Sequence, residues 1–509
     1  MARMTAQSGD ERQRGAEAFA SGDLRPAGIP HKCGVFAVHG GDDPVRLTYL
    51  ALFALQHRGQ EAAGIAAADG RQLQVRRGQG LVAEALRPQD LDALAALRPL
   101  AAIGHVRYST TGASVLANAQ PLLFHHRGGA VAIAHNGNLT NAGRLRAEYE
   151  AAGSIFQTST DTEIIAHLMA RSRAADLRDA LLYALDRVEG AYSLVVQSAD
   201  RIWVCRDPHG IRPLVLGQRD QALVAASETC ALDAIGAVPL RSVQPGEVAE
   251  FGPDGLRTVR RSASPGGRLC LFEFIYLARP DSDLQGRNVH LVRKEMGRRL
   301  ARRAPVEADV VVGVPDSGIS AAVGYGEEAG IPYELGLIKN RYVGRTFIQP
   351  GQSLREVAVR MKLNAVPAVL AGRRVVLVDD SVVRGTTARH LVRLVRRAGA
   401  REVHLRVASP PFHHACFYGI DIPTEGELLA PGRTPAEMAA IVEADSLAFL
   451  DLEAAVEAAG GVAAAPPAAS GFCTACFSGV YPVEPPGERP AAEPLAAAAS
   501  RAAGGEDRP

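Results

Sequence analysis

The sequence predicts an α+β domain followed by an α/β domain, because the hydrophobic pattern changes in the middle of the chain. Up to about residue 253, short apolar runs alternate with turns, as in antiparallel sheets, and helical spacing interrupts them at 44–56 and 160–170. From about residue 269, near-continuous apolar runs at 309–314, 374–378 and 402–408 alternate with helices. Such runs are typical of strands that are buried on both faces of a parallel sheet.

The bulk composition is that of a globular protein and excludes several classes of partner. Hydrophobic residues make up 47% and charged residues 22% of the 509 residues, and the formal net charge is +1. A net charge this close to zero argues against a nucleic-acid partner. No apolar run approaches the roughly 20 residues that a helix needs to span a membrane. The first thirty residues lack the apolar stretch of a secretory signal, and seven cysteines do not make a disulfide framework. We therefore expect a cytoplasmic protein without a nucleic-acid or membrane partner.

Changes in composition divide the chain into five parts. We expect a flexible leader or propeptide, a first domain, a second domain, an ordered tail segment and a disordered tail, at 1–32, 33–260, 261–460, 461–485 and 486–509. A further stretch at 443–459 has helical spacing and is predicted to be a helix.

Cys33 stands at the junction between the leader and the first predicted strand. Taken alone, Cys-Gly before a strand favours a buried structural cysteine. Here it is followed, in order, by QHRGQE at 56–61, GHVRYST at 104–110, HNGNL at 135–139 and STDTE at 159–163. Each fragment is weak by itself, but the ordered set resembles the N-terminal-nucleophile glutaminase domain, which has an αββα layered fold.

This resemblance implies roles for six residues. The leader is removed, Cys33 becomes the first residue, and its free α-amino group, with an ordinary pKa near 7.7–8.0, shuttles the proton while the thiolate attacks glutamine. Taken alone, Asn136-Gly137 would indicate a hairpin turn, and Arg107 would be interpreted as one partner of a surface ion pair. The resemblance implies instead a set of catalytic and glutamine-binding residues: Asn136 and Gly137 for the oxyanion, Arg107 for the α-carboxylate, Asp161 for the α-ammonium, and Arg58 beside the nucleophile.

The second signature is the run VVLVDDSVVRGTT at 375–387. A buried strand ends in Asp379 and Asp380, and a short polar turn then opens a helix predicted at 386–398, which Gly399 caps. Backbone N–H groups at a helix start favour an anion, and an acid pair can hold ribose hydroxyls directly or through a divalent metal. The pattern is not a Walker A loop. It resembles the type I phosphoribosyltransferase motif, which implies diphosphate-sugar binding by Asp379, Asp380, Arg384, Gly385, Thr386 and Thr387.

Two further fragments extend this resemblance. VGVPDSG at 312–318 follows a strand and resembles the loop that meets diphosphate and metal, so Ser317, with Asp379 and Asp380, is the expected Mg²⁺ ligand set. KNRYVGRTF at 339–347 is basic and resembles a loop that closes over the substrate, with Lys339, Arg341 and Arg345 toward the diphosphate.

Together the two signatures resemble the amidophosphoribosyltransferase family, also called glutamine phosphoribosyldiphosphate amidotransferases. The resemblance runs from Cys33 to about Pro482. It implies the first step of purine synthesis, in which glutamine and 5-phosphoribosyl 1-diphosphate give 5-phosphoribosylamine, glutamate and diphosphate. The family is typically a homo-oligomer, a tetramer or dimer, and purine nucleotides inhibit it.

Four cysteines match an iron–sulfur subgroup of this family in their sequence context: Cys270, Cys416, Cys473 and Cys476. Four thiolates suit a [4Fe–4S] cluster and also a structural Zn²⁺, so spacing leaves both metals open and only the resemblance favours iron. Cys205 and Cys230 match no ligand position and are predicted to be buried small hydrophobes.

Two other functions compete with this interpretation. Another Cys-first glutamine amidotransferase would share the first domain, but the run at 375–387 argues for a phosphoribosyl acceptor. A regulator that senses phosphoribosyl diphosphate without turnover would not need Cys33, Arg107, Asn136 and Asp161 together, and the chain has no basic DNA-reading segment.

Overall fold

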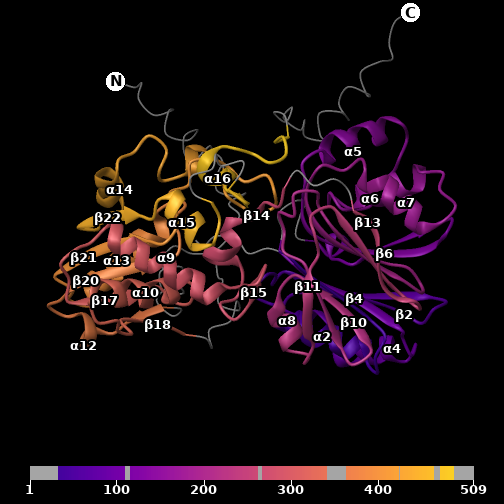
Figure 1. Cartoon of the computed structure of the whole chain (residues 1–509), viewed down its shortest axis with the longest axis horizontal. Coiled ribbons are helices and arrows are strands. Elements are labelled where there is room, and N and C mark those ends of the chain that lie inside the picture. The colour runs from indigo at the N-terminus through magenta and orange to yellow at the C-terminus, as the bar shows by residue number, and fades with distance from the viewer. Residues whose placement is uncertain are drawn as a thin grey trace, which may run out of the picture.

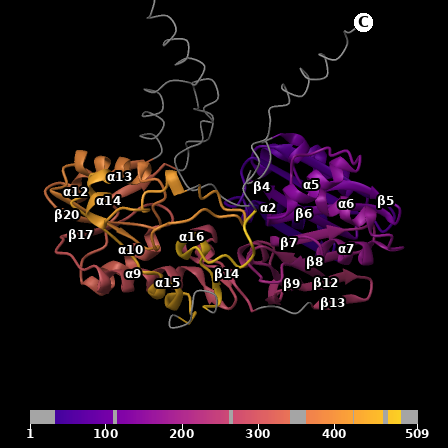
Figure 2. The same ribbon diagram turned by 90° about the horizontal axis from the view of Figure 1, so that it is seen from above.

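The protein consists of two bodies that lie side by side, as two orthogonal views show (Figures 1 and 2). The structure is a computed structural model that describes residues 33–108, 115–261, 266–340, 363–423, 425–462 and 470–486. The predicted leader lies outside these residues, as does nearly all of the predicted disordered tail. Among the described residues, no helix is long and apolar enough to cross a bilayer.

The first body is built on two antiparallel sheets. One has seven strands, in the order β11 (Val238–Ser242), β9 (Val215–Arg219), β10 (Ala222–Ala226), β1 (Gly34–His39), β4 (Ala101–Arg107), β2 (Ala62–Ala68) and β3 (Leu73–Gln79). The other has six, in the order β13 (Gly255–Arg261), β12 (Glu247–Gly252), β8 (Ile202–Arg206), β7 (Gly190–Gln197), β6 (Gly129–Leu139) and β5 (Leu122–His126).

Alternation along the strands explains why these sheets stack. In β1, Val35 and Ala37 point into a core shared by both sheets, whereas Phe36 and Val38 point to the opposite face and pack against helices. Helices cover the outer face of each sheet, so the first body has four layers in the order αββα.

The helices on the seven-stranded sheet are α2 (Pro44–Ala54), α3 (Val82–Ala85), α4 (Pro88–Ala95) and α8 (Thr229–Asp233). The helices on the six-stranded sheet are α5 (Ala142–Ala151), α6 (Glu163–Arg171) and α7 (Leu177–Leu185).

The second body is a parallel sheet between two layers of helices. Its strands run in the order β17 (Val310–Gly313), β20 (Arg374–Asp379), β21 (Glu402–Val407) and β22 (Ser446–Phe449). One face carries α9 (Val289–Arg303), α10 (Ile319–Ala329) and α15 (Leu452–Ala458), and the other carries α12 (Pro367–Leu370), α13 (Thr386–Arg397) and α14 (Pro435–Val442). The predicted α+β and α/β architecture is therefore confirmed.

The prediction of one helix at 443–459 was wrong. Residues Ser446–Phe449 form β22, which pairs with β21 at the edge of the sheet, and only Leu452–Ala458 are helical. A short apolar run has no periodicity that separates a strand from a helix, so the pairing partner decides its structure. By contrast, the helix predicted at 386–398 is confirmed as α13, and Gly399 follows its cap with φ +96°.

Short elements join the two bodies. After β13 the chain forms β14 (Leu269–Cys270) and the π-helix η2 (Glu273–Leu277), and two-residue strands β15 (Asp283–Leu284) and β16 (Arg287–Asn288) lead into α9. The tail returns here as β23 (Phe472–Cys473), parallel to β14, and then α16 (Ala475–Ser478). Two further short strands, β18 (Leu337–Lys339) and β19 (Leu363–Ala365), form a ribbon beside the parallel sheet.

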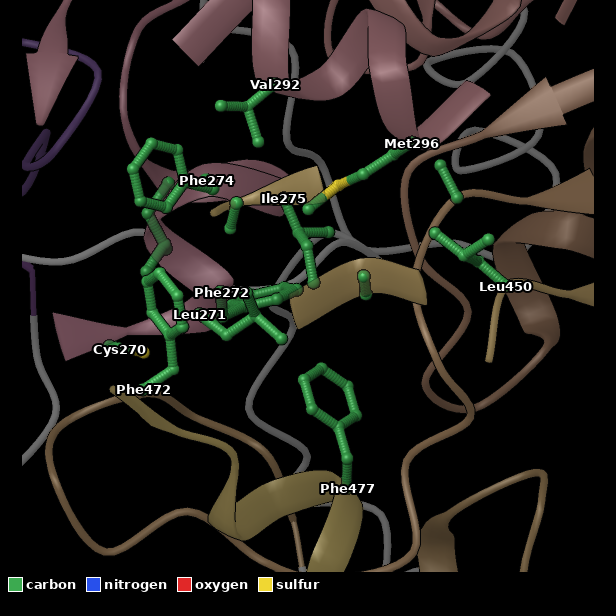
Figure 3. Packing of buried hydrophobic residues seen from close by; sticks show 14 of the residues in the cluster. Cys270, Leu271, Phe272, Phe274, Ile275, Val292, Met296, Leu450, Phe472 and Phe477 are labelled. Carbon is green, nitrogen blue, oxygen red and sulfur yellow. The ribbon is translucent and has the colours of Figure 1, made fainter. Parts of the chain in front are cut away.

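Aromatic rings anchor this tail in the core of the second body (Figure 3). Phe472 meets Phe274 edge-on at 6.1 Å between ring centroids, and Phe412 lies between Phe272 at 5.5 Å and Phe477 at 4.9 Å. All five rings are buried, so the tail segment is an integral part of the hydrophobic core.

Candidate functional site

Cys33 directly precedes β1, the central strand of the seven-stranded sheet, and its thiol lies at the end of the neighbouring strand β4. Its Sγ donates to the carbonyl of Tyr108 over 3.5 Å, and the residue is 8% exposed. Burial raises the pKa of the Cys33 thiol, and the charge of Arg107 offsets only part of this effect. The thiol is therefore protonated at neutral pH and needs a base before it can attack.

A small cavity of about 10 Å³, close to the space of one water molecule, adjoins this thiol. Strands β4 and β6 and the turn before α6 supply its walls. The lining residues are Cys33, Arg107, Tyr108, Gln120, His135, Gly137, Thr160 and Asp161. Four residues predicted for glutamine chemistry, Cys33, Arg107, Gly137 and Asp161, thus meet at one place, and the cavity must widen to admit a glutamine side chain.

Asn136 and Gly137 lie near the end of β6, where the backbone departs from regular strand geometry. Gly137 has φ +152°, and a Cβ there would lie 1.9 Å from the carbonyl oxygen of Ala191, so only glycine fits. The Asn136 side chain is 1% exposed, and its Nδ2 has no hydrogen-bond partner among the described residues. A buried donor without a partner is costly in a resting protein, and a developing oxyanion would satisfy it.

Asp161 is fixed in its ionised form by neighbours on β6 and α6. Its Oδ2 accepts from the Leu139 N–H at 2.9 Å and lies 3.7 Å from Nδ1 of His135, and its Oδ1 accepts from the Thr162 hydroxyl at 3.4 Å. Burial alone would raise the pKa of Asp161, but these three neighbours outweigh it and hold the pKa below its usual range. The cavity therefore holds an anion that suits an ammonium group.

Arg58 lies beside the nucleophile, but it is not among the residues that line the cavity. A Cβ on Gly34 would lie 3.2 Å from Cδ of Arg58. Its Nε donates to Glu228, and its Nη2 donates to Glu273 over 2.5 Å, so the buried guanidinium joins the first body to η2. Burial would lower the pKa of Arg58, but the two carboxylates outweigh it and raise that pKa. The glutamine-binding role stays a prediction, and the observed contacts are structural.

Four lining residues were missed by the sequence analysis: Tyr108, Gln120, His135 and Thr160. Gln120 accepts from the His135 N–H at 2.7 Å and donates to Thr162 at 3.1 Å, so it braces β6 against α6. Strand alternation places His135 on the same side as Gly137, a signal that could have identified it. Gln120 lies in no recognisable motif.

The acid pair at the end of β20 forms the second site. Asp379 and Asp380 are buried, and the hydroxyl groups of Ser317 and Ser381 both donate to Asp380, the latter over 2.5 Å. Burial and the neighbouring Asp380 raise the pKa of Asp379 well above its usual range, and burial also raises the pKa of Asp380. The structure thus brings together Ser317, Asp379 and Asp380, which come from two loops.

The start of α13 lies directly after this pair. Gly385 adopts a left-handed conformation with φ +78°, and Thr386 and Thr387 in the first turn are exposed. Arg384 pairs with Glu427 at 2.8 Å, and Lys339 at the end of β18 pairs with Asp316 at 2.8 Å. Arg341 and Arg345 lie outside the described residues.

Tyr276 on η2 is affected electrostatically by residues of both sites. Burial and the charges of Asp380 and Asp379 raise its pKa, and Tyr108 contributes to the same shift. The phenol ring is therefore within electrostatic range of both the acid pair and the residue whose carbonyl holds Cys33.

The four candidate ligand cysteines come together at the junction of the two bodies. Cys270 on β14 and Cys473 on β23 are direct register partners, and Cys476 follows on α16. Burial raises the pKa of all four thiols, and Cys416, Cys270 and Cys473 each raise that of Cys476 further, so all four lie within electrostatic range of one another. Among the described residues, no group of three or more His, Cys, Asp or Glu side chains is arranged to hold a metal ion.

Cys205 and Cys230 lie apart from this group of four cysteines. Cys205 lies in the core between the six-stranded sheet and its helices, and Cys230 lies under the seven-stranded sheet. The prediction that both are buried hydrophobes is confirmed.

Comparison with known proteins gives a consistent result for both bodies. A family model described as "Glutamine amidotransferase domain" matches residues 105–234, and one described as "Phosphoribosyl transferase domain" matches residues 289–409. The amidophosphoribosyltransferase of Bacillus subtilis (strain 168) is 49% identical over 458 residues, which cover 90% of this chain and 95% of the relative. That of Archaeoglobus fulgidus is 48% identical over 463 residues, which cover 90% of this chain and 99% of the relative.

The solved structures agree. Glutamine phosphoribosylpyrophosphate amidotransferase from B. subtilis, complexed with ADP and GMP, superimposes with a TM-score of 0.83 at 49% identity, over 89% of this chain and 98% of that one. The chain therefore belongs to the amidophosphoribosyltransferase family.

Proposed function

We propose that this chain releases ammonia from glutamine at Cys33 and transfers it to C1 of 5-phosphoribosyl 1-diphosphate at the Asp379–Asp380 site. The products are 5-phosphoribosylamine, glutamate and diphosphate. The observation that carries the proposal is the convergence of Cys33, Arg107, Gly137 and Asp161, from four segments of the chain, on one cavity. A buried thiol, a cation and an anion share this cavity, and glutamine hydrolysis needs all three.

The glutaminase half-reaction needs a nucleophile, a proton acceptor and an oxyanion site. The Cys33 thiol passes its proton to its own α-amino group once the Lys32–Cys33 bond is cut, and the thiolate attacks the amide carbon of glutamine. The amide of Asn136 and the N–H of Gly137 stabilise the tetrahedral oxyanion, and a thioester forms as ammonia leaves. Arg107 and Asp161 hold the α-carboxylate and α-ammonium groups, and water then releases glutamate.

The phosphoribosyl half-reaction depends on holding a diphosphate and a ribose. The backbone N–H groups at the start of α13, with Thr386 and Thr387, suit the phosphate of the substrate. Ser317, Asp379 and Asp380 offer the oxygen ligands that Mg²⁺ prefers, and Mg²⁺ would neutralise the leaving diphosphate. Lys339, Arg341 and Arg345 add positive charge for the diphosphate, and closure of their loop is expected to raise glutaminase activity when the sugar diphosphate binds.

We further propose that the four thiols hold a [4Fe–4S] cluster. A single Zn²⁺ would draw four sulfurs to roughly 3.8 Å from one another, since Zn–S bonds are about 2.3 Å long. The register pairing of Cys270 with Cys473 and the mutual electrostatic effect of the four buried thiols support a shared ligand, and the sequence context of the four cysteines favours iron. The cluster would fasten the tail to β14, and iron and acid-labile sulfide analysis of anaerobically purified protein tests it. Stoichiometric zinc without iron would refute it.

Two further proposals concern the regulation of this chain by nucleotides and its assembly into an oligomer. The solved B. subtilis relative is complexed with ADP and GMP, and we propose that purine nucleotides inhibit this chain as well. We also propose a homo-oligomer, either a dimer or a tetramer. Inhibition assays with nucleotides and light scattering of the purified protein test the two statements separately.

The deciding experiment is an anaerobic assay of phosphoribosylamine formation with either glutamine or ammonium as the nitrogen source, together with mass analysis of the amino terminus. Cys33→Ala should abolish the glutamine-dependent reaction and keep the ammonium-dependent one, because only the first half-reaction uses the thiol. A wild-type protein that forms no product from glutamine, or a Cys33→Ala protein that still does, would refute the assignment.

A further inference from the structure

The strand that carries the oxyanion donors continues directly into the contact between the two bodies. Asn138 follows Asn136 and Gly137 on β6 and is half-buried. Its Nδ2 donates to the carbonyl of Phe417 over 2.8 Å, although the two residues are 279 positions apart in the chain. The oxyanion strand is thus hydrogen-bonded to a loop of the second body, 416–419, through the residue next to Gly137.

The same loop also presses on the Gly137 peptide itself. A Cβ on Gly419 would lie 2.9 Å from the carbonyl oxygen of Gly137 and 3.0 Å from its carbonyl carbon, and Gly419 has φ +95°. On the other side, the carbonyl of Ala191 leaves no room for a Cβ on Gly137. The Gly137 backbone is therefore confined between β7 and loop 416–419, and the orientation of the preceding Asn136–Gly137 peptide, which carries the Gly137 N–H, depends on both neighbours through the Gly137 torsions.

Loop 416–419 is itself held firmly. The buried guanidinium of Arg212 donates to the carbonyl of Tyr418, with Nε at 3.1 Å. The Tyr418 hydroxyl accepts from the Val483 N–H at 2.9 Å, and the Tyr481 hydroxyl donates to the carbonyl of Ala415 at 2.8 Å. The loop thus has fixed contacts with the tail and can act as a rigid support rather than a flexible cover.

We propose that Asn138 is a positioning residue for glutamine hydrolysis, which holds the Gly137 carbonyl against loop 416–419 and so fixes the backbone torsions that aim the Gly137 N–H at the developing oxyanion. The proposal rests on the proposed role of Gly137 in the oxyanion site. It makes glutaminase turnover dependent on the second body through a contact outside the residues that line the glutamine cavity. Because the donor is displaced and not removed, the loss should be about tenfold in kcat, below the roughly 10²–10³ that follows loss of a donor.

The chain offers a matched control for Asn138. Asn141, three residues further on, also donates its Nδ2 to a backbone carbonyl over 2.8 Å, but its partner Arg187 belongs to the first body. Its Oδ1 accepts from the Glu189 N–H at 3.1 Å in the same body. Asn141→Ala therefore removes a bond of equal length, together with the bond from Glu189, without touching loop 416–419.

The test compares Asn138→Ala, Asn141→Ala and wild-type full-length protein in steady-state glutamine hydrolysis and in ammonium-dependent phosphoribosylamine formation. We expect Asn138→Ala to lower glutaminase kcat about tenfold, with KM within about twofold of wild type and the ammonium-dependent rate unchanged. Asn141→Ala should lower the melting temperature and leave glutaminase kcat within about twofold. Gly419→Ala, which pushes on the Gly137 carbonyl from within loop 416–419, should reproduce the kcat loss of Asn138→Ala.

Equal losses of kcat in Asn138→Ala and Asn141→Ala would overturn the proposal, because they would show general damage to the first body. An unchanged kcat in both Asn138→Ala and Gly419→Ala would overturn it as well. If Asn138→Ala fails to fold, Gly419→Ala alone decides between these outcomes. A wild-type protein inactive toward glutamine would instead refute the proposed function, so the two failures are distinguishable.

Discussion

The Cys33 thiol is harder to ionise than that of a free cysteine, so another group must accept its proton before it can attack glutamine. Burial raises its pKa, so a thiolate formed without help would become abundant only above pH 9. The α-amino group that cleavage would expose has an ordinary pKa of about 7.7–8.0 and titrates earlier. The two mechanisms therefore predict different dependences of rate on pH.

We expect kcat/KM for glutamine hydrolysis to rise with pH and to level off near about pH 8, because the deprotonated amine then accepts the thiol proton. The measurement is a pH profile from pH 6 to 10, with ammonium-dependent synthesis as the control for stability. A rate that keeps rising tenfold per unit beyond pH 9 would show that the thiol ionises without the amine.

Asn136 is the other residue whose environment predicts a measurable effect. Its amide is buried without a partner among the described residues, and it is next in sequence to Gly137 of the cavity lining, so in the proposed oxyanion role it should act on the transition state more than on bound glutamine. Asn136→Ala should reduce kcat for glutamine roughly 10²–10³-fold and change KM little. The ammonium-dependent reaction serves as the internal control, and a variant that raised KM alone would assign Asn136 to substrate binding instead.

At the scale of elements, the pairing of β23 with β14 determines whether the tail belongs to the core. Phe472 is 3% exposed and lies against Phe274. Phe472→Ala should lower the free energy of unfolding by about 3–5 kcal/mol, because it removes a buried ring and leaves a cavity. Val480, which is 40% exposed on the same segment, is the control, since Val480→Ala should be nearly neutral. Chemical denaturation measures both, and equal effects would mean that the tail is only loosely attached.

Helices and strands with a clear hydrophobic pattern were predictable from the sequence, whereas strands that form only by pairing with a strand distant in sequence were not. Apolar runs located β17, β20 and β21, and the amphipathic stripe with Gly399 located α13 to within a residue. β22 and β23 were not predicted as strands, because each becomes one only by pairing with a strand far away in sequence.

The same distinction applies to the candidate site. Ordered motifs identified Cys33 and Asp161, but nothing local in the sequence marks Gln120, whose position depends on how β5, β6 and α6 pack. Arg58 shows the opposite case. Its motif predicts a role in glutamine binding at the cavity, whereas its observed side-chain contacts are with Glu228 and Glu273.

At the scale of the whole molecule, a buried charge network joins the two bodies. Arg58 and Arg212 from the first body both contact Glu273 on η2, and Arg58 and His57 contact Glu228. Burial would raise the pKa of Glu228, but Arg58, His57 and Ser282 outweigh it and hold that pKa well below its usual range. A carboxyl with a lowered pKa stabilises the fold above its unfolded pKa of about 4.3, and this stability is lost as the pH falls through the folded value.

Glu228→Gln should therefore cost roughly 3–5 kcal/mol of unfolding free energy at pH 7, because it leaves the buried Arg58 charge without one of its two partners. The difference from wild type should begin to shrink below about pH 4, because the unfolded wild-type chain then binds a proton at residue 228 that the folded carboxylate does not. Denaturant unfolding at pH 7 and at lower pH values tests this. Glu443→Gln breaks an exposed pair with Arg393 and should have little effect at either pH.

The parallel pairing of Cys270 with Cys473 has a consequence for biosynthesis. The ribosome makes the first of these residues about two hundred positions before the second, so the junction between the bodies stays incomplete while the whole parallel sheet is being translated. The hydrophobic surface around Phe272 and Phe274 remains without its cover until the last segment emerges. Nascent chains that stall before residue 472 should therefore present a binding site for chaperones, and full-length chains should hide it.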